Sequence, residues 1–227
     1  MEIFYDEAGR WPLAWPLYIG LVISKSSREF LKTCPLFRDS KKLSEKQREL
    51  ALQDIQTLMI NKKLIATVAS VDNTFIDSYG ITKSLFTAIC EGLYELLTTC
   101  FGEKAQEPFE LTDLIFLIKT REQKHQEEIT LVLDGNSDFW IWKALDIGTE
   151  TIVHGDDTLP EISIASILAK VNRDHAMYEF AKKYPDYHFE KHKGYGTKIH
   201  YQAIEKHGIS PIHRKLFLRK YFLHLES

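Results

Sequence analysis

Four acidic side chains follow short apolar segments that have the composition of β-strands, and together they could do chemistry. They are Asp6, Glu7, Asp134 and Asp156. Acids gathered at one place repel each other and raise each other's pKa, and divalent cations relieve that repulsion. Carboxylate oxygens are hard ligands that suit Mg²⁺ or Mn²⁺. Two such ions can stabilise the attacking and the leaving oxygen when a phosphodiester is cleaved. The pattern therefore predicts a metal-dependent nuclease.

The composition is that of an ordinary globular protein. The 227 residues are enough for one large domain, or for one domain with an appendage. No apolar run approaches the roughly 18 residues that cross a membrane, and the first residues lack the features of a secretory signal. The three cysteines have no metal-ligand spacing and indicate reduced thiols. We expect a cytoplasmic, monomeric protein that does not enter a membrane.

The net charge of −3 does not by itself indicate nucleic-acid binding, but the distribution of charge is uneven. Residues 170–220 contain 12 Lys and Arg against 5 Asp and Glu, and the rest of the chain contains 17 against 27. A basic C-terminal part beside an acidic metal site fits a footprint on a phosphate backbone. A solvated basic surface is the alternative, and charge alone slightly favours it.

Hydrophobic periodicity predicts strands and helices in alternation. Strands are expected over residues 2–6, 17–23, 64–71, 129–133 and 149–153. Helices are expected over residues 45–60, after a Ser44 capping box, and over 75–100, 161–184, 198–207 and 214–225. The polar, acidic segment 102–128 is interpreted as an excursion off the fold. The order of elements predicts a mixed α/β sheet with flanking helices.

Seven short motifs, in this order along the chain, resemble ribonuclease HII. They are Asp6-Glu7-Ala8-Gly9-Arg10, Asp39-Ser40-Lys41-Lys42-Leu43-Ser44, Leu133-Asp134-Gly135, His154-Gly155-Asp156, Ala165-Ser166-Ile167-Leu168-Ala169-Lys170-Val171-Asn172-Arg173-Asp174, Lys193-Gly194-Tyr195-Gly196-Thr197 and Ser210-Pro211-Ile212-His213-Arg214. The match runs from about residue 3 to residue 217. Ribonuclease HIII is disfavoured, because it normally has Ser-Gly-Lys where this chain has Ala8-Gly9-Arg10.

The resemblance implies a ribonuclease H-like fold, with a mixed five-stranded sheet, flanking helices and a C-terminal helical region. Residues 1–185 would form the catalytic domain, and residues 186–227 its helical substrate-binding extension. The implied activity is hydrolysis of the RNA strand of RNA–DNA hybrids, leaving 5′-phosphate and 3′-hydroxyl ends, and incision at ribonucleotides embedded in duplex DNA. The implied metal ligands are Asp6, Glu7, Asp134 and Asp156. Gly9, Arg10, Trp11, Lys41, Lys42 and Tyr195 are the expected substrate-binding residues.

Some assignments have a competing interpretation. Adjacent strand residues point to opposite faces, so Asp6 and Glu7 both reach a metal only if the chain turns there, as Gly9 would permit. Asp157 is the alternative to Asp156. Lys41 and Lys42 precede a helix, where a phosphate can bind, but lysine pairs are usually just solvated. Tyr195 lies between two glycines and could stack on a sugar or base or pack on the tail.

Other residues in the motifs invite similar comparisons. His213 and Arg214 could reach a phosphate or cap the last helix, and the sequence does not decide between these roles. Ser163, Ser166 and Asp174 are interpreted as structural residues.

The chain departs from the ribonuclease HII pattern at three positions. Trp11 replaces the last glycine of a Gly-Arg-Gly sequence whose backbone amides approach the ribose 2′-hydroxyl in that family. Trp15 replaces another glycine, and Gly80 replaces an asparagine expected near a phosphate. A glycine permits close approach because it has no Cβ. The acids are therefore kept while recognition of a single ribonucleotide is expected to differ.

Two other functions remain open from the sequence. One is a hybrid-binding protein of the same fold that cleaves poorly, and the other is a metal-dependent nuclease with another nucleic-acid substrate. A cleavage assay on a labelled RNA–DNA hybrid, with and without Mg²⁺ or Mn²⁺, distinguishes all three.

Overall fold

The computed structural model describes residues 1–102, 110–135 and 144–225 of the chain. The strands are β1 (Glu2–Ala8), β2 (Leu17–Ser24), β3 (Leu64–Val71), β4 (Thr130–Asp134) and β5 (Gly148–Ile152). The helices are α1 (Arg28–Leu31), α2 (Glu45–Ile60), α3 (Asn73–Phe101), α4 (Leu111–His125), α5 (Gly155–Thr158), α6 (Pro160–Lys183), α7 (Phe189–His192), α8 (Lys198–His207) and α9 (Lys215–Leu225). Short 3₁₀ turns cover Ser40–Lys42 and Pro185–Tyr187. Every strand and helix that the periodicity predicts is present.

The five strands form one mixed sheet in the order β3-β2-β1-β4-β5, which confirms the predicted class of fold. β1 pairs antiparallel with β2 and parallel with β4, and β5 continues the parallel half. In the parallel pair Tyr5 lies beside Leu133, so the next residues lie side by side: Asp134 ends β4, and Asp6 lies two residues before the end of β1. The central position of β1 thus brings the two acids to one edge of the sheet.

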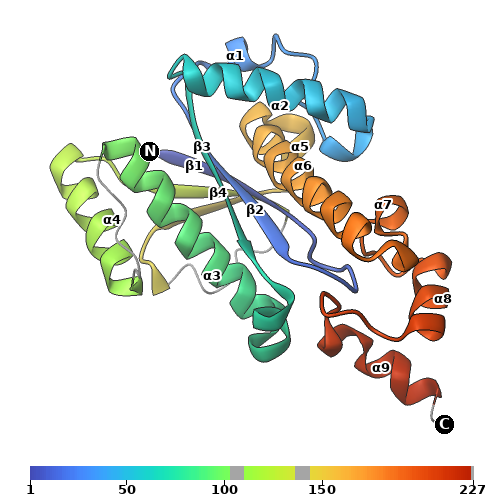
Figure 1. Cartoon of the computed structure of the whole chain (residues 1–227). Helices are drawn as coiled ribbons and strands as arrows, with labels where there is room; N and C mark the ends of the chain where they lie inside the picture. The colour runs from blue at the N-terminus through green and yellow to red at the C-terminus, as the bar shows by residue number, and fades with distance from the viewer. Residues whose placement is uncertain (103–109, 136–143, 226–227) are drawn as a thin grey trace.

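Two apolar clusters cover the two faces of the sheet. On one face, Tyr5 and Leu133 pack with residues of α3 and α4. On the other face, Phe4 and Val132 pack with residues of α2 and α6. Figure 1 shows α3 and α4 on one side of the strands and α2 with α6 on the other. Because side chains alternate along a strand, Asp6 and Asp134 extend from the face that carries α6.

The interpretation of segment 102–128 as an excursion off the fold is wrong. Its described part contains α4, which lies beside α3 (Figure 1). Leu114 and Ile118 are fully buried in the core shared with α3. The other face of α4 is exposed to solvent. It carries the polar residues of the helix and also Phe116. A short amphipathic helix buries only one face, so its average composition resembles that of a loop.

The C-terminal helices pack around the segment that joins β1 to β2. Leu13 and Ala14 share an apolar cluster with Phe189 and Ile212. Backbone hydrogen bonds run from Leu13 N to the oxygen of Gly194 and from Trp15 N to the oxygen of Ile212, each 2.8 Å. The joining segment is therefore held on both sides by the C-terminal region. Among the described residues, no helix is long and apolar enough to cross a membrane.

Candidate active site

Three of the four predicted acids meet at the end of the central strands. Oxygen atoms of Asp6, Asp134 and Asp156 all lie within 4.8 Å of one another. Asp6 and Asp156 are buried and Asp134 is partly buried. A cluster this close, with little access to water, is an unfavourable arrangement of anions unless cations bind there.

Asp156 does not extend directly from a strand, because β5 ends at Ile152 and Asp156 lies in the first turn of α5. Gly155 fixes that turn against β4: its N–H donates to Asp134 Oδ1 at 2.7 Å. A Cβ on Gly155 would lie 2.5 Å from Ile162 Cδ1 and 3.3 Å from Asp134 Oδ1, so a larger residue would require the end of the Ile162 side chain to shift.

The choice between Asp156 and Asp157 follows from their partners. Asp157 is exposed, and its Oδ2 lies 2.5 Å from Lys42 Nζ. Asp156 is 4% exposed, and its Oδ2 has no hydrogen-bond partner among the described residues. A second group of acids, Asp39, Asp156 and Asp157, could also hold an ion. In that group Lys42 approaches both Asp39 and Asp157, whereas Asp156 is approached by Lys41, whose Nζ lies 3.5 Å from its Oδ2.

Glu7 lies within β1, and the turn at Gly9 comes after the strand has ended. Its carboxylate is accordingly outside the group of three described acids whose oxygens lie within 4.8 Å. It lines the same cavity as Asp6, and its Oε1 lies 3.8 Å from Arg10 Nη1. Glu7 thus contributes negative charge at the margin of the cluster.

Three carboxyl groups of the site, those of Asp6, Glu7 and Asp156, have raised pKa values. Burial raises the pKa of Asp6 well above its ordinary value, and the charges of Glu7 and Asp134 raise it further. Burial, followed by the charge of Asp134, also raises the pKa of Asp156, and burial raises that of Glu7. Each acid therefore resists ionisation until a positive charge is placed beside it.

Lys41 is the cation nearest the three acids, with its Nζ 3.5 Å from Asp156 Oδ2. Burial opposes the charge of Lys41, but the surrounding carboxylates, led by Asp156 and Asp6, raise its pKa overall. Asp39 holds this lysine in place by accepting a 2.8 Å hydrogen bond from its backbone N–H. The predicted lysine pair therefore divides: Lys41 faces the site and Lys42 pairs with Asp157.

Three of the acids, Asp6, Glu7 and Asp134, and all of the expected substrate-binding residues except Lys42 line one cavity of about 260 Å³. Its lining comprises Asp6, Glu7, Ala8, Gly9, Arg10, Trp11, Ser40, Lys41, Asp134, Ser166, Lys170 and Tyr195. The possible metal ligands fit Mg²⁺ or Mn²⁺, because they are clustered carboxylate oxygens. One of them, Asp156 Oδ2, is buried and accepts no hydrogen bond from the described residues.

Gly9 and Trp11 both line the cavity, but Gly9 is closely packed and Trp11 is exposed. Gly9 has φ +94°, and a Cβ there would lie 2.4 Å from Arg173 Nε, so only glycine fits. Trp11 is 68% exposed, and the guanidinium of Arg10 lies 5.1 Å from the centre of its ring. The indole is therefore at the open side of the cavity and is not packed into the protein.

Tyr195 reaches the cavity from a turn held by buried histidines. Ser210 N donates to His213 Nδ1 at 2.9 Å, which leaves the proton of His213 on Nε2. His213 Nε2 then donates to His200 Nε2 at 2.9 Å, and His200 Nδ1 donates to the oxygen of Tyr195 at 2.9 Å. The ring of Tyr195 remains 42% exposed beside the Arg173 guanidinium. The turn thus presents an aromatic face from a fixed backbone.

Of the two roles considered for His213 and Arg214, the structure shows a helix-capping contact for Arg214, whose backbone oxygen accepts from Phe217 N at 3.1 Å and from Leu218 N at 3.3 Å in the first turn of α9. His213 and Arg214 are both buried, and Arg214 donates to the backbone oxygens of Gly9, Arg10 and Trp15 at 2.7, 3.1 and 2.8 Å. The side chain of Asp77 also caps this helix, since it accepts from the N–H groups of the first two residues of α9. Arg214 therefore holds the loop that carries Arg10 and Trp11.

Trp15 and Gly80 lie outside the residues that line the acidic cavity. Trp15 has φ +73°, a backbone conformation that favours the glycine expected from the family pattern at this position. The centre of its ring lies 3.6 Å from that of Phe180. Gly80 interrupts α3 with φ +80° and ψ +164°, a conformation essentially confined to glycine. Both departures from the family pattern are thus local backbone features.

Sequence reasoning underestimated Ser166 on α6. Its hydroxyl lies 2.8 Å from that of Ser40 and also hydrogen-bonds the carboxyl of Asp6. This bond favours ionised Asp6 and joins α6 to the Lys41 turn. Helical spacing offered a signal, since Ser163, Ser166 and Lys170 lie at intervals of three and four residues on one face.

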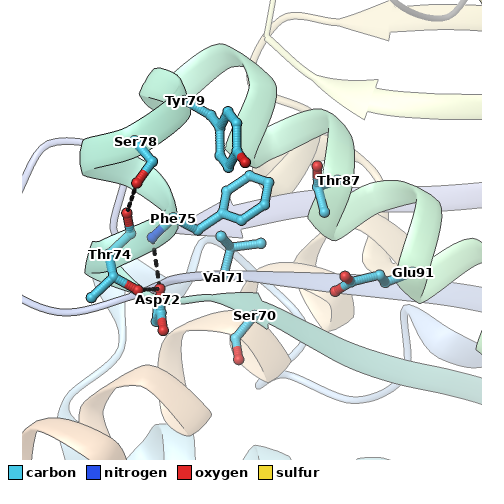
Figure 2. Close-up of a pocket in the computed structure, with 9 residues that line it drawn as sticks. All are labelled: Ser70, Val71, Asp72, Thr74, Phe75, Ser78, Tyr79, Thr87 and Glu91. Atoms are coloured by element: carbon cyan, nitrogen blue, oxygen red, sulfur yellow. Dashed lines mark hydrogen bonds between the residues drawn. The ribbon is translucent and has the colours of Figure 1, made fainter. Parts of the chain in front are cut away.

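A larger cavity, of about 390 Å³, lies where β3 meets α3 (Figure 2). Its acids are Asp72 and Glu91, and Figure 2 places them at opposite ends of the cavity. Asp72 already caps α3 by accepting from Phe75 N at 2.8 Å. This cavity lacks the converging acids of the first.

A mixed sheet that gathers acids at the end of its central strand defines a metal-dependent nuclease of the ribonuclease H fold. A family model described as Ribonuclease HII matches residues 3–100 and 141–222. A ribonuclease HII of Endomicrobium trichonymphae is 39% identical, and the alignment covers 93% of this chain and 82% of that protein. The chain belongs to the ribonuclease HII family, whose members are metal-dependent endoribonucleases that act on the RNA of hybrids.

Solved structures agree on the fold. The ribonuclease H2 of Pyrococcus horikoshii superimposes with a TM-score of 0.68 at 22% identity, covering 100% of this chain and 99% of that one. A ribonuclease HIII termed Bst-RNase HIII, solved in complex with Mn²⁺, superimposes with a TM-score of 0.58 at 13% identity, covering 95% of this chain and 64% of that one.

Proposed function

We propose that Asp6, Asp134 and Asp156, with Glu7 beside them, hold the divalent metal ions with which this chain cleaves RNA in RNA–DNA hybrids. The observation that carries the proposal is the convergence of three carboxylates within 4.8 Å, two of which, Asp6 and Asp134, line a cavity together with Lys41, Arg10 and Tyr195. Bound metal ions would activate water and stabilise the departing oxygen. The expected products carry 5′-phosphate and 3′-hydroxyl ends.

The protein's own residues would orient the nucleic acid. Lys41 places a positive charge 3.5 Å from Asp156 and can contact a phosphate next to the scissile bond. Ser166 favours ionised Asp6 through its hydrogen bond. Residues 9–11, fixed by Arg214, would approach the ribose backbone from one side, and Tyr195 would stack from the other. Lys42 would add sequence-independent attraction.

The finer substrate range belongs to the same proposal. We infer that the enzyme incises duplex DNA at embedded ribonucleotides but prefers runs of ribonucleotides, because the exposed indole of Trp11 restricts close approach at a lone ribose. It would act as a monomer, with residues 1–185 as the catalytic domain and 186–227 as its substrate-binding extension. The apolar cluster that joins Leu13 to Ile212 supports treating these parts as one domain.

Neighbouring acids provide a matched test of the metal site. Asp156→Asn removes a clustered carboxylate, whereas Asp157→Asn removes an exposed one that pairs with Lys42. Cleavage of a labelled hybrid with Mg²⁺ or Mn²⁺ should fall by at least about 10³-fold in the first variant, which corresponds to about 4 kcal/mol of transition-state stabilisation. It should change by less than about tenfold in the second. Equal losses would exclude the assignment of Asp156, and a wild-type protein that binds hybrid without cleaving it would exclude the enzyme.

A further inference from the structure

The wall of the acidic cavity formed by α6 carries a cation, Lys170, that the metal chemistry does not use. Lys170 lines the cavity one helical turn, about 5.4 Å, beyond Ser166, which contacts Asp6. It thus lies between the acid cluster and Tyr195, whose ring is beside Arg173 on the next turn of α6. A strand that extends from the acids to Tyr195 would pass the amine of Lys170.

The amine of Lys170 is fixed in position before any substrate arrives. It donates to Asp174 Oδ1 at 2.7 Å, and the side chain is only 22% exposed. Arg48 approaches the other oxygen of Asp174 at 3.6 Å, and it donates to the backbone oxygens of Ser40 and Leu43 at 3.1 and 2.7 Å. These contacts tie Lys170 to the turn that carries Lys41.

Positive charge exceeds negative charge along this wall. Asp174 is shared by Lys170 and Arg48, and it also lies in the field of Arg173 and Lys193. Arg173 is fully buried, and its Nε and Nη1 have no hydrogen-bond partner among the described residues. Burial, together with Arg173 and Arg48, lowers the pKa of Lys170 against the opposing effect of Asp174. A phosphate beside Lys170 would reduce this excess of positive charge.

We propose that Lys170 is a substrate-binding residue that contacts a backbone phosphate of the strand lying between the metal-binding acids and Tyr195. The inference rests on the proposed hybrid-cleaving function, which it deepens by assigning a second phosphate contact in addition to that of Lys41. Since Asp174 satisfies the amine in the free protein, the phosphate would join or replace this contact without a large movement of the helix.

The test compares variants by steady-state kinetics on an RNA–DNA hybrid over a range of salt concentrations. Lys170→Gln should raise KM about tenfold with little change in kcat, as expected for one charge-assisted hydrogen bond. It should also reduce the slope of log(kcat/KM) against log salt by about one unit, because one phosphate contact is lost. Lys170→Arg should restore most of the affinity and the slope. Lys182→Gln, at an exposed lysine of the same helix, is the matched control.

Asp174→Asn distinguishes a phosphate contact from a structural ion pair. It removes the carboxylate partner but keeps the Lys170 charge, so the salt slope should stay at or above the wild-type value. If Lys170→Gln leaves Asp174 too poorly compensated for the protein to fold, the double variant Lys170→Gln/Asp174→Asn removes both charges and should show the same loss of slope. A wild-type slope in the Gln or double variant overturns the proposal. Wild-type protein that does not cleave the hybrid instead overturns the proposed function.

Discussion

Acidification should destabilise the protein through the two buried histidines that hold the Tyr195 turn. Burial lowers the pKa of His200 to about 3 and that of His213 to about 4, from an ordinary value of 6.5. Both are therefore neutral in the folded protein, whereas the unfolded chain takes up a proton on each below pH 6.5. Their contribution to stability is complete above pH 6.5 and is lost as the pH falls toward 4 and then 3.

The magnitude follows from these two pKa values. At pH 4.5 each histidine would cost about 2.5 kcal/mol if it titrated alone. The two rings contact each other, with Nε2 atoms 2.9 Å apart, so we expect a combined loss of about 3–5 kcal/mol. That is a large part of the roughly 5–15 kcal/mol that stabilises a typical domain. The cost is high because protonated rings would lose their acceptor atoms within the apolar C-terminal cluster.

Urea unfolding between pH 5 and 6.5 measures this effect directly. The slope of the unfolding free energy against pH reports protons taken up on unfolding, at about 1.4 kcal/mol per pH unit for each proton. His200→Gln should reduce that uptake by about one proton relative to the wild type. His207→Gln replaces an exposed histidine of the same helix and should leave the slope near its wild-type value. An unchanged slope in His200→Gln would refute the neutral, buried assignment.

Three further outcomes are expected. Replacing Lys41 and Lys42 together by alanine should weaken binding to every hybrid alike and flatten its dependence on log salt; an unchanged slope would make them ordinary surface lysines. Trp11→Gly should raise activity selectively on duplex DNA with a single ribonucleotide, and the idea fails if wild-type protein already incises that substrate as well as a long hybrid. Burial and repulsion raise the pKa of Asp6, so the metal-free protein loses stability as pH rises from the ordinary aspartate range through that raised value. Mn²⁺ at one fixed concentration, 100 times its Kd near pH 8, should therefore raise Tm by about 5–10 °C near pH 8 and by less near pH 5, where its binding is weaker, and an equal rise at both pH values would contradict this linkage.

Local sequence patterns predicted most of the elements because each depends on nearby residues. The Ser44–Gln47 capping box starts α2 as expected, and an apolar run forms each central strand. The described part of segment 102–128 was misread because α4 buries a narrow stripe against α3, which composition does not reveal.

Contacts between distant residues account for the rest of the site. Nothing local to Arg214 indicates that it binds the oxygen of Gly9, 205 residues earlier in the chain. The bond from Ser166 to Asp6 likewise depends on how α6 crosses β1. The acids themselves were predictable because each follows an apolar run, but the separation of Glu7 from the other three depends on where β1 ends.

The central claim is that the clustered carboxylates support metal-dependent cleavage of the RNA strand, and Asp134→Asn tests it most directly. Asp134 lies between Asp6 and Asp156 and contributes charge but little exposed surface. With Mg²⁺ or Mn²⁺, the wild-type protein should cleave a labelled RNA–DNA hybrid, while Asp134→Asn should bind the same hybrid with nearly unchanged affinity and cleave it at least about 10³-fold more slowly. An Asp134→Asn protein that cleaves at close to the wild-type rate would contradict the account.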